Sequence, residues 1–409
     1  MMIDGKRLYE RIYELGRIGQ REDGGVYCLA LTPVSVTTLD IIKGYMEEAG
    51  LEVRYDKAGN LIGRLEGEEK DGAVVMTGSH VDSVYCGGMF DGRLGVLGAI
   101  EALDAIRKNK ISHRLPIEVC VFRDQQGVRF SGSYCGSGYM TGRKRMDTLR
   151  CVDQQGVTVE KALRHIGINP DTLHEAKLPL GYVKAFVELH IEQGKRLEEA
   201  GVPVGVVTGI QSQIRGKFIF KGQSGHGGTV LMEDRRDALM AAAEVMLELE
   251  KITKSKNTAV MTIGTVDVRP GSINTVPGQV EFTVDVRDKN RDVRDSILKK
   301  AYQTGQEICD RRGIYMEFYP FNAGNERVLC DEEVQSVIAH AIQEEGIEPY
   351  FLESMAGHDS SRFAAICKAG MIFVRSREGK SFCKEEWSSM EDCRTGAEVL
   401  CKTMIRLAQ

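Results

Sequence analysis

The sequence lacks the features that would point to a membrane or a nucleic acid. No apolar run approaches the ~20 residues that a membrane-spanning helix needs. The formal net charge is −5 and the basic residues are not clustered, which excludes an extended cationic surface. The N-terminal stretch reads as a charged amphipathic helix without the apolar core and cleavage site of a signal peptide. We therefore expect a cytoplasmic protein with no membrane or nucleic-acid partner and with a small-molecule ligand.

A disulfide framework is not expected either. The chain has 11 cysteines, an odd number, and none of them forms a CxxC pair. So many free cysteines are easiest to maintain in a reducing cytosol, where most thiols act as small buried hydrophobic groups.

The first half of the chain has the pattern of an α/β domain. A length of 409 residues exceeds the usual size of one hydrophobic core, so two domains are expected. β-Rich runs at 73–77 and 117–122 flank a helical pattern at 94–107, and this alternation predicts a largely buried sheet. A further strand at 182–191 places its apolar residues on one face and His190 on the other.

From about Ile210 the pattern changes to the order β-α-β-β-α-β, which is the ferredoxin-like split βαβ arrangement. After it, a helix and a β-rich run return to the first domain. We predict that residues 1–209 and 326–409 form one α/β domain and that 210–325 form an inserted α+β domain on two hinge connections. The predicted elements of the insertion are strand 217–221, helix 235–252, strand 259–268, strand 279–287, helix 293–312 and strand 314–319.

The strongest local signal is GSHVDSVYCGGMFDG, residues 78–92, which follows directly on a buried strand. The carboxyl end of a strand is where α/β sheets bind ligands. His80 and Asp91 are candidate metal ligands there, with Asp82 placed to orient the His80 ring. A histidine near two aspartates is more often a hydrogen-bonded loop cluster, but His190 offers a third ligand and favours a metal site.

Further motifs follow along the chain: QGVRFSGSYCGS, ELHIEQG, GHGG followed by MEDRRDAL, INTVPG, VDVRD, AGHDS and IFVRSREG. With them, nearly the whole sequence closely resembles the hydantoinase/carbamoylase-type amidohydrolases of the zinc aminoacylase and carboxypeptidase superfamily. This group includes N-carbamoyl-amino-acid hydrolases, ureidopropionases and allantoate amidohydrolases. The resemblance implies a zinc-exopeptidase-like α/β catalytic domain with a ferredoxin-like lid and dimerisation domain, and hence a homodimer.

The resemblance also implies a metal site. In that family two zinc or manganese ions share an aspartate, which matches Asp91. One ion is also held by histidines that match His80 and His190, and the other by a glutamate and a C-terminal histidine. A neighbouring glutamate takes the proton of the attacking water. The two glutamate positions are here Gln125, in the base position, and Gln126, in the second-metal position.

A third departure is Phe382, which stands where the family has the C-terminal histidine. The amide of Gln125 cannot accept a proton, and an amide at Gln126 is a poorer ligand than a carboxylate. We therefore expect one divalent ion, zinc or manganese, and no second ion. Asp124 and Cys383 adjoin replaced positions, but adjacent strand residues face opposite ways, so we interpret both as ordinary neighbours.

The residues that would hold the substrate match the family pattern. Arg287 suits a bidentate bond to a carboxylate, and His226 and His358 suit an oxyanion contact or proton transfer. Arg287 as a surface ion pair and Asn274 as a turn residue are common alternatives, whereas the glycines around His226 favour a ligand contact. The full set that matches substrate-contacting positions is Gln193, His226, Asn274, Arg287 and His358.

These residues leave two functions open. The first is an amidohydrolase-fold enzyme that nominally cleaves a linear C–N bond of a small ureido or N-carbamoyl, allantoate-like carboxylic acid, or rearranges such an acid. A different reaction on the same substrate frame could use His226, His358 or Asp82 for proton transfer. The second is an inactive or metal-free relative that binds a ligand or performs a different reaction in the same pocket. A peptidase or aminoacylase fits less well, because ELHIEQG and GHD point to the carbamoylase branch.

Overall fold

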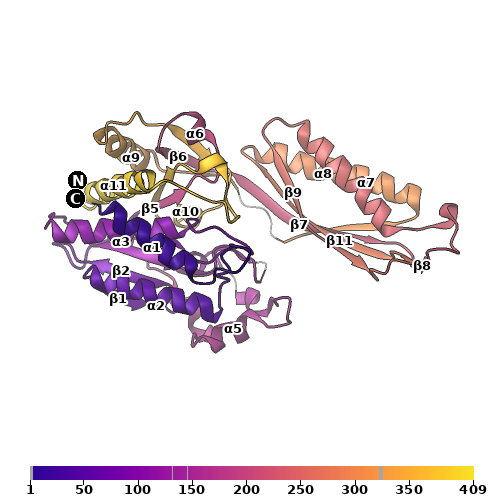
Figure 1. The fold of residues 1–409 in the computed structure, drawn as a ribbon, viewed down its shortest axis with the longest axis horizontal. Helices are drawn as coiled ribbons and strands as arrows, with labels where there is room; N and C mark the ends of the chain where they lie inside the picture. Colours follow the sequence, from indigo (N-terminus) through magenta and orange to yellow (C-terminus); the bar gives the residue numbers. More distant parts are fainter. Residues whose placement is uncertain (1–2, 131, 145, 322–325) are drawn as a thin grey trace. The chain divides into compact units, whose positions relative to one another are not determined.

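The computed structural model describes residues 3–130, 132–144, 146–321 and 326–409, which form two compact units (Figure 1). Unit 1 comprises the chain up to Gly209 together with Leu329–Gln409, and unit 2 is the intervening Ile210–Val328. Unit 2 is therefore an insertion in the sequence of unit 1.

In the described residues, unit 1 is built on a nine-stranded sheet with the order β1-β2-β4-β3-β5-β15-β6-β13, and β14 pairs with β6. β3 runs parallel to β4 and β5, and β15 runs parallel to β5. These four strands are almost entirely buried, as expected for parallel strands covered on both faces. The strands are Glu52–Tyr55 (β1), Leu61–Leu65 (β2), Val74–His80 (β3), Ile117–Phe122 (β4), Val183–Ile191 (β5), Val204–Ile210 (β6), Val328–Leu329 (β13), Phe351–Ser354 (β14) and Lys368–Val374 (β15).

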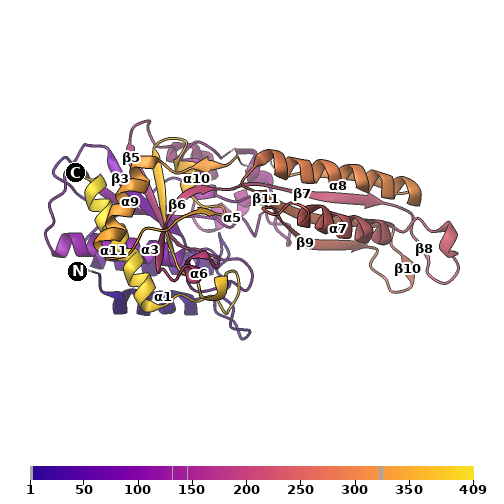
Figure 2. The same ribbon diagram turned by 90° about the horizontal axis from the view of Figure 1, so that it is seen from above.

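Helices pack on both faces of this sheet. One face meets α3, α9 and α11, and α1 packs on α3 and α11 (Figure 2). The other face meets α4 and α10. Among the described residues, no helix combines the length and the apolar character needed to cross a bilayer. The helices of unit 1 are Gly5–Arg17 (α1), Pro33–Glu48 (α2), Arg93–Lys108 (α3), Cys135–Met140 (α4), Val159–His165 (α5), Arg196–Glu199 (α6), Glu332–Glu344 (α9), Ser360–Phe363 (α10) and Met390–Leu407 (α11).

The described residues of unit 2 form a four-stranded antiparallel sheet with the order β12-β7-β11-β9 and with α7 and α8 on one face (Figure 1). Its main elements follow the predicted order β-α-β-β-α-β. A separate two-stranded pair joins Gly225–His226 (β8) to Thr275–Val276 (β10). The main elements are Ser212–Lys221 (β7), Ala238–Lys254 (α7), Val260–Arg269 (β9), Gln279–Asp288 (β11), Arg291–Arg312 (α8) and Tyr315–Pro320 (β12).

Two predicted boundaries differ from the structure for local reasons. The helix predicted from 235 begins at Ala238, because the Asp237 side chain accepts hydrogen bonds from the first backbone N–H groups and so caps the helix there. The strand predicted at 217–221 begins at Ser212, where it pairs with Asp288 at the end of β11. The mixed α/β fold predicted from the sequence is confirmed.

Parallel strands bring several sequence segments to one edge of the unit 1 sheet. β3, β4, β5 and β15 point the same way, so the residues at their carboxyl ends lie side by side. His80 ends β3, the DQQG segment follows β4, and His190 is the last residue but one of β5. This edge carries the candidate site.

Candidate metal centre and ligand residues

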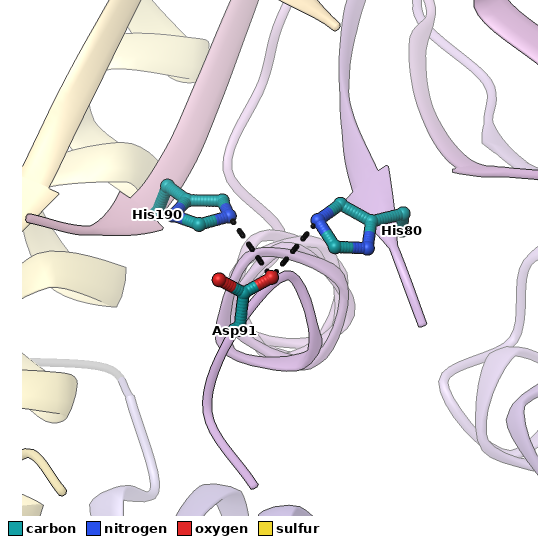
Figure 3. Close-up of side chains that lie close together, drawn as sticks. All are labelled: His80, Asp91 and His190. Carbon is teal, nitrogen blue, oxygen red and sulfur yellow. Dashed lines mark ion pairs between the residues drawn. The ribbon is translucent and has the colours of Figure 1, made fainter. Parts of the chain in front are cut away.

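His80, Asp91 and His190 converge at the strand ends of unit 1 (Figure 3). The Nε2 atom of His80 lies 3.3 Å from Asp91 Oδ1, and the Nε2 atom of His190 lies 3.8 Å from the same oxygen. All three side chains are buried, and one ligand atom of each lies within 4.8 Å of the others. This is the group that sequence analysis selected as metal ligands.

Gly92 allows the loop that carries Asp91 to reach His80. Its φ angle is 68°, and a Cβ atom there would lie 2.4 Å from the His80 carbonyl oxygen and 2.6 Å from the His80 Cε1 atom. Glycine adopts this left-handed conformation without the steric cost that other residues meet. A glycine directly after Asp91 is therefore what this close approach requires.

Backbone carbonyl groups orient both histidine rings. His80 Nδ1 lies 3.0 Å from the carbonyl oxygen of Asp82, and His190 Nδ1 lies 2.9 Å from that of Ile191. A carbonyl oxygen only accepts, so each neutral ring carries its proton on Nδ1 and directs the Nε2 lone pair toward Asp91. Within the described residues, the buried His80 Nε2 has no hydrogen-bond partner. Two imidazole nitrogens and one carboxylate in this arrangement fit a single divalent ion such as zinc or manganese.

The charges at the site shift the pKa values of its groups. Burial lowers the pKa of His190. Burial acts on His80 in the same direction, but the neighbouring Asp91 and Asp82 carboxylates raise the pKa of His80 to about 9. Burial favours the neutral form of Asp91, whereas His80 and His190 hold the pKa of Asp91 well below its usual range. Asp91 is thus ionised, and a cation binding here would displace a proton from His80.

The Asp91 carboxylate is also enclosed by neutral donors. Gln126 Nε2 lies 3.0 Å from Asp91 Oδ1, and Gln193 Nε2 lies 2.6 Å from Asp91 Oδ2. The Ser381 Oγ atom also lies 3.3 Å from Oδ2. A carboxylate only accepts, so each glutamine turns its N–H group toward Asp91. Gln126 therefore presents a donor where a second cation would need an acceptor.

Gln125 is buried beside Gln126. Its Nε2 donates to the carbonyl oxygen of Gly357 at 3.2 Å, and its Oε1 has no hydrogen-bond partner among the described residues. The backbone N–H groups of Gln125 and Gln126 donate to the Asp82 carboxylate at 3.2 and 2.9 Å. Asp82 thus fixes the backbone of the glutamine pair as well as the His80 ring.

The other residues near the replaced positions do not supply the missing groups. Phe382 has a φ of 58° and leaves 46% of its surface exposed, so its side chain is not buried with the ligand residues. Asp124 accepts a hydrogen bond from Cys135 Sγ at 3.1 Å, and burial raises its pKa to about 6. Cys383 is a half-buried free thiol. In the described chain, neither Asp124 nor Cys383 belongs to the group that could hold a metal.

The predicted residue His358 lies beside this centre, together with two carboxylates, Glu188 and Asp359, that sequence analysis missed. The His358 ring is buried, with its centroid 4.6 Å from that of His190. Glu188 precedes His190 by two residues on the same strand face, and Asp359 follows His358. Burial, together with the charge of Glu188, raises the pKa of Asp359 to about 8. The two-residue spacing of Glu188 and His190 was a signal available in the sequence.

Glu386 is a third carboxylate that sequence analysis missed. Its buried carboxylate accepts the backbone N–H groups of Phe90 and Asp91 at 2.8 and 2.9 Å through Oε1. Through Oε2 it accepts the Ser381 hydroxyl at 2.9 Å and the Phe382 N–H at 3.3 Å. Glu386 thus ties the loop that carries Asp91 to the C-terminal loop. Burial, together with the charge of Asp91, raises the pKa of Glu386 to about 7.

We expect Glu386→Ala to weaken metal binding by ~10–100-fold, as removal of an outer partner that orients a ligand does in other metal sites. Metal affinity would be measured by competition with a chelating dye. Glu385→Ala is the matched control, because Glu385 is an exposed neighbour of the same type. Equal metal affinities of the two variants would contradict the orienting role of Glu386.

Unit 2 holds the remaining predicted ligand residues. His226 in β8 pairs with Thr275 of β10, and the Gly227 N–H donates to the Asn274 carbonyl oxygen at 2.7 Å. The structure therefore brings the exposed residues His226 and Asn274 together at one small pair of antiparallel strands. Arg287 lies near the end of β11, where its Nε and Nη2 atoms donate to the Asp285 carboxylate at 2.9 and 2.8 Å. The ion pair considered as an alternative for Arg287 is thus present.

Comparison with known proteins places these features in a family. Residues 76–406 match peptidase family M20/M25/M40. The chain is 43% identical to an N-carbamoyl-L-amino acid amidohydrolase of Geobacillus stearothermophilus over 414 residues, covering 100% of both chains. It is 35% identical to allantoate deiminase 1 of Glycine max, over 92% of this chain and 84% of that protein.

A solved structure shares the whole fold. The crystal structure of a hydantoinase/carbamoylase family amidase from Burkholderia vietnamiensis matches with a TM-score of 0.94 and 32% identity, covering 100% of this chain and 98% of that one. The chain therefore belongs to peptidase family M20/M25/M40, among the hydantoinase/carbamoylase-type amidohydrolases.

Proposed function

We propose that this protein acts on a small ureido or N-carbamoyl carboxylic acid at a mononuclear metal centre formed by His80, Asp91 and His190. One observation carries the proposal: the Nε2 atoms of His80 and His190 both face the same Asp91 oxygen. Each ring is held in this orientation by a hydrogen bond from its Nδ1 to a backbone carbonyl oxygen. Relatives named for N-carbamoyl amino acids and allantoate support this substrate class.

A divalent zinc or manganese ion held by these residues would supply Lewis-acid polarisation of the scissile carbonyl. The chain itself would bind and orient the acid and move the protons. In unit 1, His358 and Asp82 lie beside the centre and are the groups proposed to take or give a proton. Gln193, His226, Asn274 and Arg287 are the proposed substrate contacts, with His226 also a candidate for proton transfer.

A second ion does not fit the residues present. Gln126 directs an N–H donor at Asp91, and the Phe382 side chain cannot ligate a metal. We therefore propose that the second-metal position is filled by hydrogen bonds between side chains. A neutral amide at Gln125 also leaves the usual base position without a group that accepts a proton.

This last observation favours a second candidate function, in which the protein binds the same class of acid without hydrolysing it or carries out a different reaction. An assay for ammonia released from N-carbamoyl-L-amino acids and allantoate, with metal-loaded protein, distinguishes the two. Metal-dependent release supports the hydrolase. Ligand binding without ammonia release supports the second candidate. If the protein neither binds the acid nor releases ammonia, both candidate functions are excluded.

Arg287→Ala is expected to weaken binding of an N-carbamoyl amino acid by about 2 kcal/mol or more, because the substrate carboxylate loses a charged partner. Titration calorimetry would measure this change. Arg269→Ala is the matched control, since Arg269 donates to Asp267 with the same two-residue spacing but on an exposed surface. An unchanged affinity in Arg287→Ala would remove Arg287 from the substrate site.

We also propose that unit 2 mediates a homodimer. Among the described strands, β9 and β12 are the outer strands of its sheet, and most residues of β9 are exposed. Outer strands carry unpaired backbone groups that can pair with another chain. Sedimentation velocity at micromolar concentration is expected to give a dimer, and a monomer would rule out this role.

A further inference from the structure

A cavity of about 470 Å³ lies in unit 1 between α2, the end of β1, the start of the DQQG loop and the segment after α5. None of the candidate metal ligands lines it. Its lining includes the charged residues Arg123, Lys57, Asp40 and Asp56, the aromatic residue Tyr55 and the aliphatic residues Val36, Ile166 and Ile168. The cavity thus combines two cations, two anions and an apolar surface. Lys57, the second cation, is exposed and lies 4.0 Å from the Glu175 carboxylate outside the cavity.

Arg123 is half-buried, and its guanidinium has few protein partners. Its Nε donates to the Gly59 carbonyl oxygen, and among the described residues no hydrogen bond occupies its two terminal nitrogens and no ion pair joins it to a carboxylate. Burial lowers the pKa of Arg123 from its ordinary value, against the weaker effect of Tyr55, Asp56 and Asp40. The two terminal nitrogens remain accessible, so a ligand that enters the cavity can reach them.

The carboxylate of Asp56 also lines the cavity but is already occupied. It accepts the N–H of Ala58 at 2.9 Å, the N–H of Asn60 at 2.8 Å and the Asn60 side-chain amide at 2.7 Å. Asp40 differs, because it lies exposed on α2 and close enough to affect the pKa of Arg123 without forming an ion pair with it. Arg123 and Asp40 are therefore two opposite charges that face one cavity and remain apart.

The local backbone is shaped to hold Arg123 here. Gly59 has a φ of 77°, and a Cβ atom there would lie 2.6 Å from Arg123 Nε and 2.4 Å from Ile168 Cδ1. The Arg123 backbone N–H donates to Asn60 Oδ1 at 3.0 Å, and its carbonyl oxygen accepts from Gly136 at 2.8 Å. Both the side chain and the main chain of Arg123 are thus fixed at the cavity wall.

We propose that this cavity is a second ligand site that binds a free α-amino acid with an aliphatic side chain. The amino acid carboxylate would pair with the Arg123 guanidinium, which suits planar carboxylates. Its ammonium group would pair with Asp40, and its side chain would contact Val36, Ile166 and Ile168. The inference stands on the cavity alone and does not depend on the reaction at the metal centre.

Titration calorimetry of L-leucine into the full-length protein tests this site. Arg123→Gln and Asp40→Asn are each expected to weaken leucine binding by at least about tenfold. N-acetyl-L-leucine, which lacks the ammonium, and L-leucinamide, which lacks the carboxylate, are expected to bind at least about tenfold more weakly than leucine to the unchanged protein. Arg143→Gln, at an exposed arginine outside the cavity, is expected to bind leucine normally.

Arg287→Ala separates this site from the proposed substrate site, because it is expected to keep leucine binding while losing affinity for the N-carbamoyl acid. Asp40→Asn changes an exposed side chain, so it keeps the test open if Arg123→Gln fails to fold. The proposal is overturned if leucine does not bind at millimolar concentration, if Asp40→Asn binds it as tightly as the unchanged protein, or if N-acetyl-L-leucine binds equally well.

Discussion

Replacing Gln125 and Gln126 by glutamate and Phe382 by histidine is expected to raise hydrolysis of an N-carbamoyl amino acid by at least ~100-fold. Gln125→Glu supplies a carboxylate that accepts a proton, which the amide does not. Gln126→Glu replaces the N–H donor that lies 3.0 Å from Asp91 by an oxygen that binds a cation. Phe382→His has space because the side chain is exposed, and histidine tolerates a positive φ.

The same triple variant is expected to bind a second ion, measured by elemental analysis beside initial rates. The chain offers a matched control, because residues 124–128 and 153–157 both read DQQGV. Gln154 and Gln155 are exposed, so Gln154→Glu with Gln155→Glu adds the same charge away from the centre and is expected to change neither property. A folded triple variant that keeps the original rate and one ion would contradict our interpretation of Gln125 and Gln126.

Removing a proposed ligand is expected to have the second large effect. His80→Ala and His190→Ala should each lower metal affinity by more than ~100-fold, because losing even an outer partner costs ~10–100-fold. Each variant deletes the Nε2 atom that faces Asp91 Oδ1 and leaves the rest of the site in place. Competition with a chelating dye, on protein reloaded with zinc or manganese, would measure the change.

His174→Gln is the control for these variants, because His174 is exposed and lies outside the centre. Its metal content is expected to equal that of the unchanged protein. Circular dichroism would show that each variant retains its fold. If His80→Ala and His190→Ala were folded and still bound metal with the original affinity, the ion would not be held at this position.

Much of the fold could be predicted from local sequence patterns. Short β-rich runs that alternate with a helical pattern predicted the buried strands, and the six elements of unit 2 occur in the predicted order. The boundaries that shifted depend on single interactions: the Asp237 cap begins α7 three residues late, and pairing with β11 extends β7 backward. Hydrophobic periodicity does not reveal such contacts, so it predicts whether a segment is a helix or a strand better than it predicts where the segment begins and ends.

The site could be predicted only in part. His80, Asp91 and His190 lie in motifs, and the structure brings them together. Glu386 lies 295 residues from the Asp91 N–H that it accepts, so no local pattern indicates this contact. The hydrogen bond from Gln126 to Asp91 could not be predicted from the sequence either, because the sequence does not show that these two side chains meet or which end of the amide faces the carboxylate.

The number of metal ions per chain tests the central claim most directly. Protein purified without chelator and analysed for zinc and manganese is expected to contain one ion per chain. This result would match the ligand set of His80, Asp91 and His190 beside an amide donor at Gln126. Two ions per chain would contradict the proposal that Gln126 and Phe382 exclude a second metal, and no bound metal after reloading would contradict the mononuclear centre itself.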